Sequence, residues 1–100
     1  MSPHPPADAR TRQRCLRFLH EPRLWPTWPY LPLVRRRPGA EPEFGVLYDA
    51  LHAAGRTGLS ATVFLCNVFL LPPTEDEFLA LPRETYDTAE EVVDTGWSVD

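Results

Sequence analysis

The chain has 100 residues, twelve of them proline, and a formal net charge of −4 at neutral pH. This length fits one domain rather than two, and a hydrophobic content of 43% with 11% aromatic residues is too high for an intrinsically disordered chain. The sequence lacks the run of about 20 apolar residues that a membrane-spanning helix needs. It also lacks the pattern of a signal peptide, so we expect a cytoplasmic protein with no membrane partner.

The first predicted element is a helix. Residues 1–8 are rich in proline and are expected to form a disordered tail. Asp8 is placed as the N-cap of a helix over residues 9–20, and Pro22 ends that helix. Apolar side chains fall on one face of the helix and arginines on the opposite face, which is typical of a helix that packs on a core.

A segment rich in proline and tryptophan follows. Prolines recur at positions 26, 29 and 32, which is the three-residue period of a polyproline II helix. This period predicts an extended strap over residues 22–32, with Trp25 and Trp28 in one row. Residues 33–37 are expected to continue as an edge strand. The arginines at its end would keep that edge from pairing with other chains, or would pair with the acidic residues 75–77.

Two further segments have the character of strands. Alternating apolar residues predict a strand over residues 44–50, followed by a loop over 51–60 with one helical turn near its start. Residues 61–71 form the strongest predicted strand because they are apolar on both faces. Within it, Asn67 must be hydrogen-bonded, lie at a bulge or face a pocket, since an unpaired buried amide costs about 1–3 kcal/mol.

Two short helices are predicted near the C-terminus. Residues 74–77 form a capping box that starts a helix over 75–81. Residues 87–90 repeat the pattern and start a second helix that runs through Asp94, with Gly96 just beyond its end.

These elements together predict an α+β fold for a single globular domain over residues 9–100. The expected architecture is a small antiparallel sheet of two to four strands with an N-terminal helix, the strap and two short C-terminal helices. Because the segment 61–71 is apolar on both faces, a partner subunit could cover it, and a homodimer is a possible assembly.

Charge is distributed unevenly along the chain. Residues 1–40 carry eight arginines against two acidic residues, whereas residues 74–100 carry nine acidic residues against one arginine. This asymmetry is typical of a nucleic-acid-binding arm or an acidic tail. It equally fits two ends of one fold that pack together, which is the interpretation we favour. All ten basic residues are arginine and the sequence has no isoleucine, as expected for a GC-rich bacterial genome.

The sequence predicts no cofactor and no metal site. It has no pair of cysteines or histidines at the spacing of a structural zinc site. The glycine-containing segment 55–60 lacks the lysine and the full spacing of a phosphate-binding loop. Cys15 and Cys66 are expected to be reduced core thiols.

We expect a non-catalytic interaction module whose contact surface lies within residues 23–37. Tryptophan and arginine are the residue types that most often dominate the binding energy of protein interfaces. The predicted contact residues are Arg23, Trp25, Trp28, Tyr30, Arg35, Arg36 and Arg37.

Two alternatives stay open. The arginine-rich N-terminal half could bind the phosphates of a nucleic acid, although the net charge of −4 opposes this. A small enzyme could instead use His52 with Asp49 or with Cys66. In that case 100 residues must supply both a core and an enclosed pocket.

Overall fold

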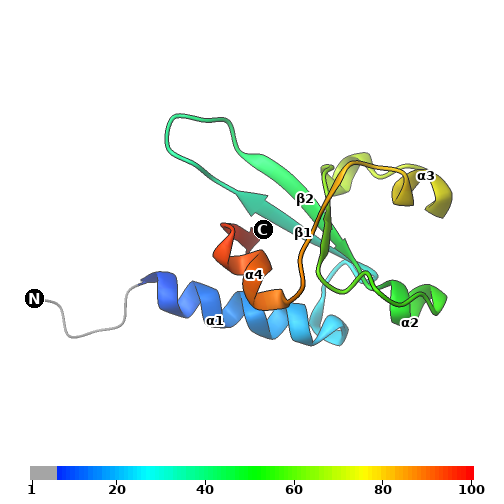
Figure 1. Cartoon of the computed structure of the whole chain (residues 1–100), viewed down its shortest axis with the longest axis horizontal. Coiled ribbons are helices and arrows are strands. Elements are labelled where there is room, and N and C mark those ends of the chain that lie inside the picture. The colour runs from blue at the N-terminus through cyan, green and yellow to red at the C-terminus, as the bar shows by residue number, and fades with distance from the viewer. Residues whose placement is uncertain (1–6) are drawn as a thin grey trace, which may run out of the picture.

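A five-stranded antiparallel sheet forms the centre of the computed structural model, which describes residues 7–100 (Figure 1). The strand order across the sheet is β4-β3-β2-β1-β5. The α+β class with an antiparallel sheet is therefore confirmed, but the predicted two to four strands are too few. The strands are β1 (Tyr30–Arg35), β2 (Glu43–Tyr48), β3 (Thr62–Phe64), β4 (Arg83–Thr85) and β5 (Trp97–Val99).

Helices cover both faces of the sheet. In the described range, the long helix and three short ones are α1 (Ala7–His20), α2 (Ala50–Ala54), α3 (Glu75–Leu79) and α4 (Ala89–Asp94). Two 3₁₀ turns, η1 (Pro22–Leu24) and η2 (Val68–Leu70), complete the elements. Helix α1 begins at Ala7, so Asp8 lies inside the helix and is not its N-cap. Of the disordered tail expected over residues 1–8, positions 1–6 lie outside the described residues.

One face of the sheet packs against α1 and α4. Leu19 of α1 and Val92 of α4 join Leu33, Leu47 and Val63 of the central strands in one buried cluster. The opposite face packs against α3, whose Phe78 belongs to a second cluster with other residues of the same strands. Alternate residues of β2 enter the two clusters, as the predicted alternation requires.

The basic and the acidic ends of the chain lie side by side (Figure 1). Arg12 of α1 pairs with Asp94 of α4 at 3.1 Å, and His20 Nε2 lies 3.6 Å from a carboxylate oxygen of Glu90. The amide of Val99 in β5 also donates to Cys15 Sγ in α1 at 3.3 Å. This is the arrangement that the favoured interpretation of the charge asymmetry predicts.

Residues 22–32 do not form an extended strap. The chain makes η1, then a turn in which the amide of Trp28 donates to the carbonyl of Trp25 at 3.2 Å, and then enters β1. Trp25 is 6% exposed and Trp28 is 48% exposed, so the two indoles do not share one row. A polyproline II helix has no internal hydrogen bonds, and burial of Trp25 together with these turn bonds gives a more stable local structure.

Strand β1 is an interior strand and not the predicted edge strand. It lies between β2 and β5, and Leu33 is in register with Gly45 on one side and Val99 on the other. Pro32 fits this position because its carbonyl accepts the amide of Asp100 at 3.0 Å, just beyond β5. Pro32 has no N–H to donate, but it lies opposite Asp100, beyond the last residue of β5. No residue within β5 therefore loses a hydrogen bond.

The predicted strand over residues 61–71 is mostly a turn. Only Thr62–Phe64 forms β3, and Asn67 then caps η2 by accepting the amide of Phe69 on Oδ1 at 3.0 Å. Asn67 is thus hydrogen-bonded, which is one of the predicted possibilities. Its side chain offers the backbone a local alternative to pairing in the sheet. Of the apolar residues after it, Val68 and Leu71 pack against the second cluster, whereas Phe69 and Leu70 are exposed.

The two predicted capped helices are confirmed with small changes of position. Thr74 accepts the amide of Glu77 at the start of α3, at 3.2 Å. Thr88, one residue after the predicted Asp87, accepts the amide of Glu91 at the start of α4, at 3.2 Å. Gly96 follows α4 with φ of +105°, a backbone conformation that other residues rarely adopt.

Candidate functional site

Trp25, one of the predicted contact residues, belongs to the core. Its Nε1 donates to the carbonyl of Phe18 at 2.7 Å, and its ring packs in the cluster between α1 and the sheet. A buried indole with a satisfied N–H is a typical core tryptophan. We therefore leave Trp25 out of the contact surface proposed below.

Arg35 is also buried, in a network of charges. Its Nη1 and Nη2 donate to the two carboxylate oxygens of Glu84 at 2.9 Å, and its Nε donates to Glu43 at 2.8 Å. The guanidinium lies 4.3 Å above the ring of Trp97. Hydrogen bonds from Arg35 lower the pKa of Glu84 to about 2, and those to Glu43 and Glu84 raise the pKa of Arg35. The side chain of Arg35, in β1, thus contacts residues of β2, β4 and β5 and is not available to a partner.

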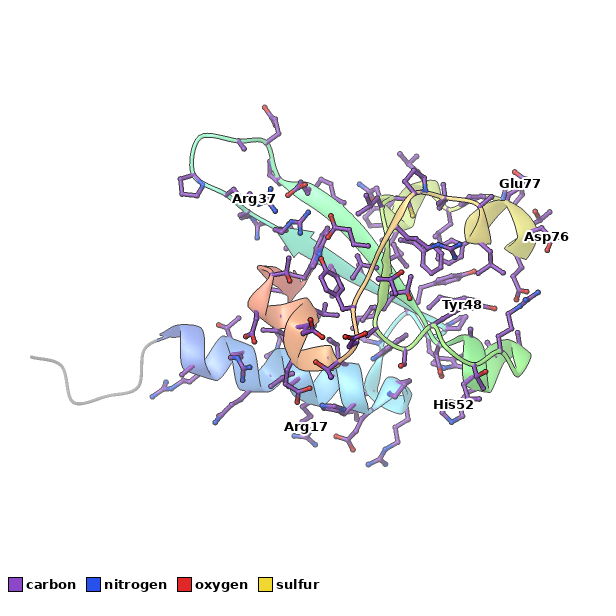
Figure 2. All side chains as sticks on the ribbon, in the orientation of Figure 1. Arg17, Arg37, Tyr48, His52, Asp76 and Glu77 are labelled. Carbon is purple, nitrogen blue, oxygen red and sulfur yellow. The ribbon has the colours of Figure 1, made fainter. Side chains whose placement is uncertain are left out.

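The remaining predicted residues separate along β1. Tyr30, at its start, is half-buried and stacks on Tyr48 with ring centroids 5.2 Å apart. Arg36 and Arg37 follow the other end of β1 and are exposed. Figure 2 shows Arg37 near the β1–β2 hairpin and His52 at the opposite end of the molecule. The predicted surface over residues 23–37 is therefore not one continuous patch.

Trp28 is the exposed aromatic residue at the end of the molecule that carries α2. Its Nε1 donates to Oδ2 of Asp49 at 2.8 Å. The Asp49 side chain is only 6% exposed, and it also caps the N-terminus of α2. The indole thus presents an apolar ring to solvent while its N–H is held by a buried carboxylate.

Asp49 also contacts His52. Nδ1 of His52 lies 3.0 Å from both carboxylate oxygens, which orients the imidazole and leaves Nε2 on the other side of the ring. The His52 side chain is mostly exposed. The sequence-based pairing of Asp49 with His52 is therefore formed, because residues three apart meet at the start of a helix.

A groove lies between the C-terminal end of α1 and α2, and it consists of two hollows. The Trp28 hollow has a volume of about 620 Å³, and the inner hollow, which is lined by core residues, has a volume of about 340 Å³. We call the two together the Trp28 groove. Both hollows are lined by His20, Pro22, Asp49 and His52. The inner hollow adds the apolar side chains Leu19, Trp25, Leu47, Leu51 and Leu59.

Each hollow has one arginine on its wall. Arg23 lines the Trp28 hollow and donates from Nη2 to Glu21 at 2.9 Å. Arg56 lines the inner hollow and donates from Nε to Glu75 at 2.9 Å. Hydrogen bonds from Arg23 and Arg17 lower the pKa of Glu21, and hydrogen bonds from Tyr48 and Arg56 lower the pKa of Glu75, so both glutamates are ionised at neutral pH.

Glu75 connects the groove to the second core cluster. The hydroxyl of Tyr48 donates to Glu75 Oε2 at 2.6 Å, beside the contact with Arg56. Burial and this hydrogen bond raise the pKa of Tyr48 to about 12. Arg56 is thereby held at the wall by a carboxylate that is itself fixed to the sheet.

Cys66 does not join the His52 site. It is half-buried against the cluster that contains Phe64, on the α3 face of the sheet, and burial raises the pKa of its thiol. A thiol with a raised pKa is a poor nucleophile at neutral pH.

In residues 7–100, no group of three or more histidine, cysteine or acidic side chains is arranged to hold a metal ion. Within the same residues, no helix has the length and apolar character to cross a bilayer.

Comparisons with protein-family models, with curated proteins and with solved structures find no significant match for this chain. The groove itself is then the basis for a functional assignment. The sequence did not predict that His20, Arg56 and Leu59 belong to one site, because three separate segments meet there only in the folded chain. Two sequence signals did point to this place: the predicted contact residues Arg23, Trp25 and Trp28, and the spacing of Asp49 and His52 at a predicted helical turn.

Proposed function

We propose that this protein is a non-catalytic interaction module that binds a segment of another protein in the Trp28 groove. The observation that carries this proposal is that Trp28 is both exposed and fixed, through its hydrogen bond to Asp49. A rigid tryptophan loses little conformational entropy when a partner covers it. Tryptophan and arginine are also the residues that most often dominate binding energy, and Arg23 lines the same hollow.

The inner hollow supports the same proposal. It offers a hollow of about 340 Å³ with large apolar side chains on its wall, and it shares lining residues with the hollow that Trp28 lines. Interfaces are strongest where a bulky side chain of one partner fills a desolvated pocket of the other. We place the module in the cytoplasm, supported by the two free cysteines, Cys15 and Cys66, which such a reducing compartment would preserve.

Affinity capture from a cell lysate tests the proposal with three forms of the full chain. We expect the wild-type protein to retain a partner and Trp28→Ala to lose it. The matched control is Arg10→Gln, an exposed residue at the other end of α1. Melting temperatures close to that of the wild type would show that the variants are folded. An unchanged set of captured proteins with Trp28→Ala would disprove the proposal.

A second candidate function is a small enzyme with His52 as general base. The observation that favours it is the 3.0 Å contact between Asp49 and Nδ1 of His52, the geometry in which a carboxylate orients a catalytic imidazole. Turnover of small esters by the wild type, lost in His52→Gln without a change in melting temperature, would support this candidate. Turnover that persists in His52→Gln would remove it.

The nucleic-acid alternative draws less support from the arrangement of the arginines. Arg12 and Arg17 of helix α1 each pair with a carboxylate of the chain itself. These acidic partners would lie close to any phosphate backbone that approached the basic helix. A binding constant for DNA that falls steeply with salt would be the sign of this function.

A further inference from the structure

We propose that the segment recognised by the Trp28 groove is an acidic peptide that carries a bulky apolar residue. This inference rests on the proposed function and specifies the chemistry of its partner. It follows from the hydrogen-bonding groups and apolar side chains of the groove that have no partner, or only a partial one, within the fold.

The apolar part of the partner follows from the inner hollow. Its wall contains five apolar side chains, and Leu51 among them is 55% exposed. Covering exposed apolar surface removes it from water, which stabilises a complex. A leucine-sized or phenylalanine-sized side chain in this hollow would cover Leu51, next to the hollow that Trp28 lines. The apolar wall is formed by Leu19, Trp25, Leu47, Leu51 and Leu59.

The acidic part follows from the hydrogen-bonding groups that the fold leaves free. Both carboxylate oxygens of Asp49 are already in contact with Trp28 or His52. The two carboxylate oxygens of Glu21 accept from Arg17 and Arg23. The carboxylates of the groove are thus engaged within the chain, and a basic ligand would have to compete with four existing partners, Trp28, His52, Arg17 and Arg23.

The donors of the groove are less fully used. A guanidinium has five N–H groups, and the described hydrogen bonds of Arg23 and Arg56 each engage one nitrogen. Both side chains are about half exposed or more. One arginine lines each hollow, so carboxylates on either side of an apolar residue could meet one arginine each. The lining carboxylates of Glu21 and Asp49 balance the two arginines in formal charge. The unused N–H donors, rather than a net positive charge, therefore favour a peptide with carboxylates over a neutral or a basic one.

Selection from a random peptide display library tests this inference on the immobilised full chain, with Trp28→Ala used to identify binders specific to the groove. We expect the peptides that depend on Trp28 to be enriched in aspartate or glutamate next to leucine or an aromatic residue. Peptides that depend on Trp28 without an excess of acidic residues would overturn the partner chemistry and leave the interaction function standing. If no peptide depends on Trp28, the proposed function itself fails.

Calorimetry with a synthetic peptide of the selected consensus gives a second, quantitative test. We expect Arg23→Gln and Arg56→Gln each to weaken binding by about two- to fivefold, as for charge pairs at an exposed rim, and Arg10→Gln to leave the affinity unchanged. Equal affinities for all four proteins would overturn the inference. A single-stranded oligonucleotide that binds more tightly than the peptide, and depends on Arg23, would overturn it in favour of nucleic acid.

Discussion

The indole nitrogen of Trp28 lies 2.8 Å from Oδ2 of Asp49, so an aromatic residue that is about half exposed donates a hydrogen bond to a buried carboxylate. The same carboxylate caps α2 and contacts His52. The position of the exposed ring is therefore coupled to the local fold of α2. A change at Asp49 should affect both.

Replacement of Asp49 by alanine should increase the mobility of the Trp28 side chain, because the indole loses its hydrogen-bond acceptor. We expect Asp49→Ala to lower the free energy of unfolding by about 1–3 kcal/mol, from the lost cap and the lost hydrogen bond to the indole. Amide and indole hydrogen exchange measured by NMR should show faster exchange at Trp28 Nε1, with no change at the indole of Trp25. Unchanged exchange at Trp28 would contradict the role assigned to Asp49.

The two tryptophans of the turn should differ strongly in their contribution to stability. Trp25→Ala removes a core side chain and should cost about 3–5 kcal/mol, a large part of the total stability of a small domain. Trp28→Ala should cost about 1 kcal/mol, mainly through the hydrogen bond that Asp49 loses. Urea denaturation followed by circular dichroism measures both values. Similar losses for the two variants would mean that Trp28 also belongs to the core.

Arg35, the last residue of β1, and Arg36, which follows it, offer a matched pair. Arg35→Ala leaves Glu84 and Glu43 without their shared partner and removes the cation from the ring of Trp97. We expect a loss of about 3–5 kcal/mol, as for one partner of a buried ion pair. Arg36→Ala, one residue further along and exposed, should change the free energy of unfolding by about 0.5 kcal/mol at most. Equal effects would show that the buried network contributes little.

Acid should destabilise the protein through Glu84. Its pKa is lowered from 4.5 to about 2, first of all by the hydrogen bonds from Arg35. A carboxyl group with a lowered pKa in the folded state contributes stability above its unfolded pKa, and this contribution is lost as the pH falls towards the folded value. The free energy of unfolding should therefore decline between pH 4.5 and pH 2.

Glu84→Gln is the variant that tests this pH dependence. It should be less stable than the wild type at neutral pH and should lose less stability on acidification. Part of the dependence should remain, because the pKa of Glu43 and that of Glu75 are also lowered. Thr85→Ala, an exposed neighbour on β4, serves as the control and should keep the wild-type slope. A Glu84→Gln curve parallel to that of the wild type would refute the assignment.

Gly45 allows β2 to approach its neighbours closely. A Cβ atom at this position would lie 2.5 Å from Cγ1 of Val63 and 3.1 Å from two ring atoms of Trp97. Gly45→Ala should therefore cost about 1–3 kcal/mol through overpacking. The double variant with Val63→Ala should lose less than the sum of the two single variants, since the added methyl group then has space. Strict additivity in thermal unfolding would contradict this contact.

Features set by local chemistry were predictable from the sequence. The hydroxyls of Thr74 and Thr88 start short helices, and Gly96 follows the second one, because capping depends on a few neighbouring residues. The strand at Glu43–Tyr48 follows from the alternation of apolar residues. The helical turn of α2 follows from local chemistry too, since Asp49 caps it. Asp49 and His52 were the part of the groove that local spacing could indicate.

Features set by contacts between distant segments were not predictable. Strands β4 and β5 have three residues each, too few for a periodic pattern, and they exist because β3 and β1 offer them partners. Burial of Arg35 depends on Glu84, which is 49 positions away. Trp25 and Trp28 are both followed by proline, and Trp25 is covered because distant segments, α1 and the central strands, pack around it.

Strand β1 has an implication for how the chain folds as it is synthesised. The β1–β2 hairpin contains only nearby residues and can form early, but the other edge of β1 pairs with Trp97–Val99, more than 60 positions later. Until those residues leave the ribosome, the nascent chain exposes an open strand edge and an arginine without its aromatic neighbour. An open edge is where unfinished chains associate with one another. Rapid chain elongation, or a chaperone that covers β1, would therefore favour the native fold over such association.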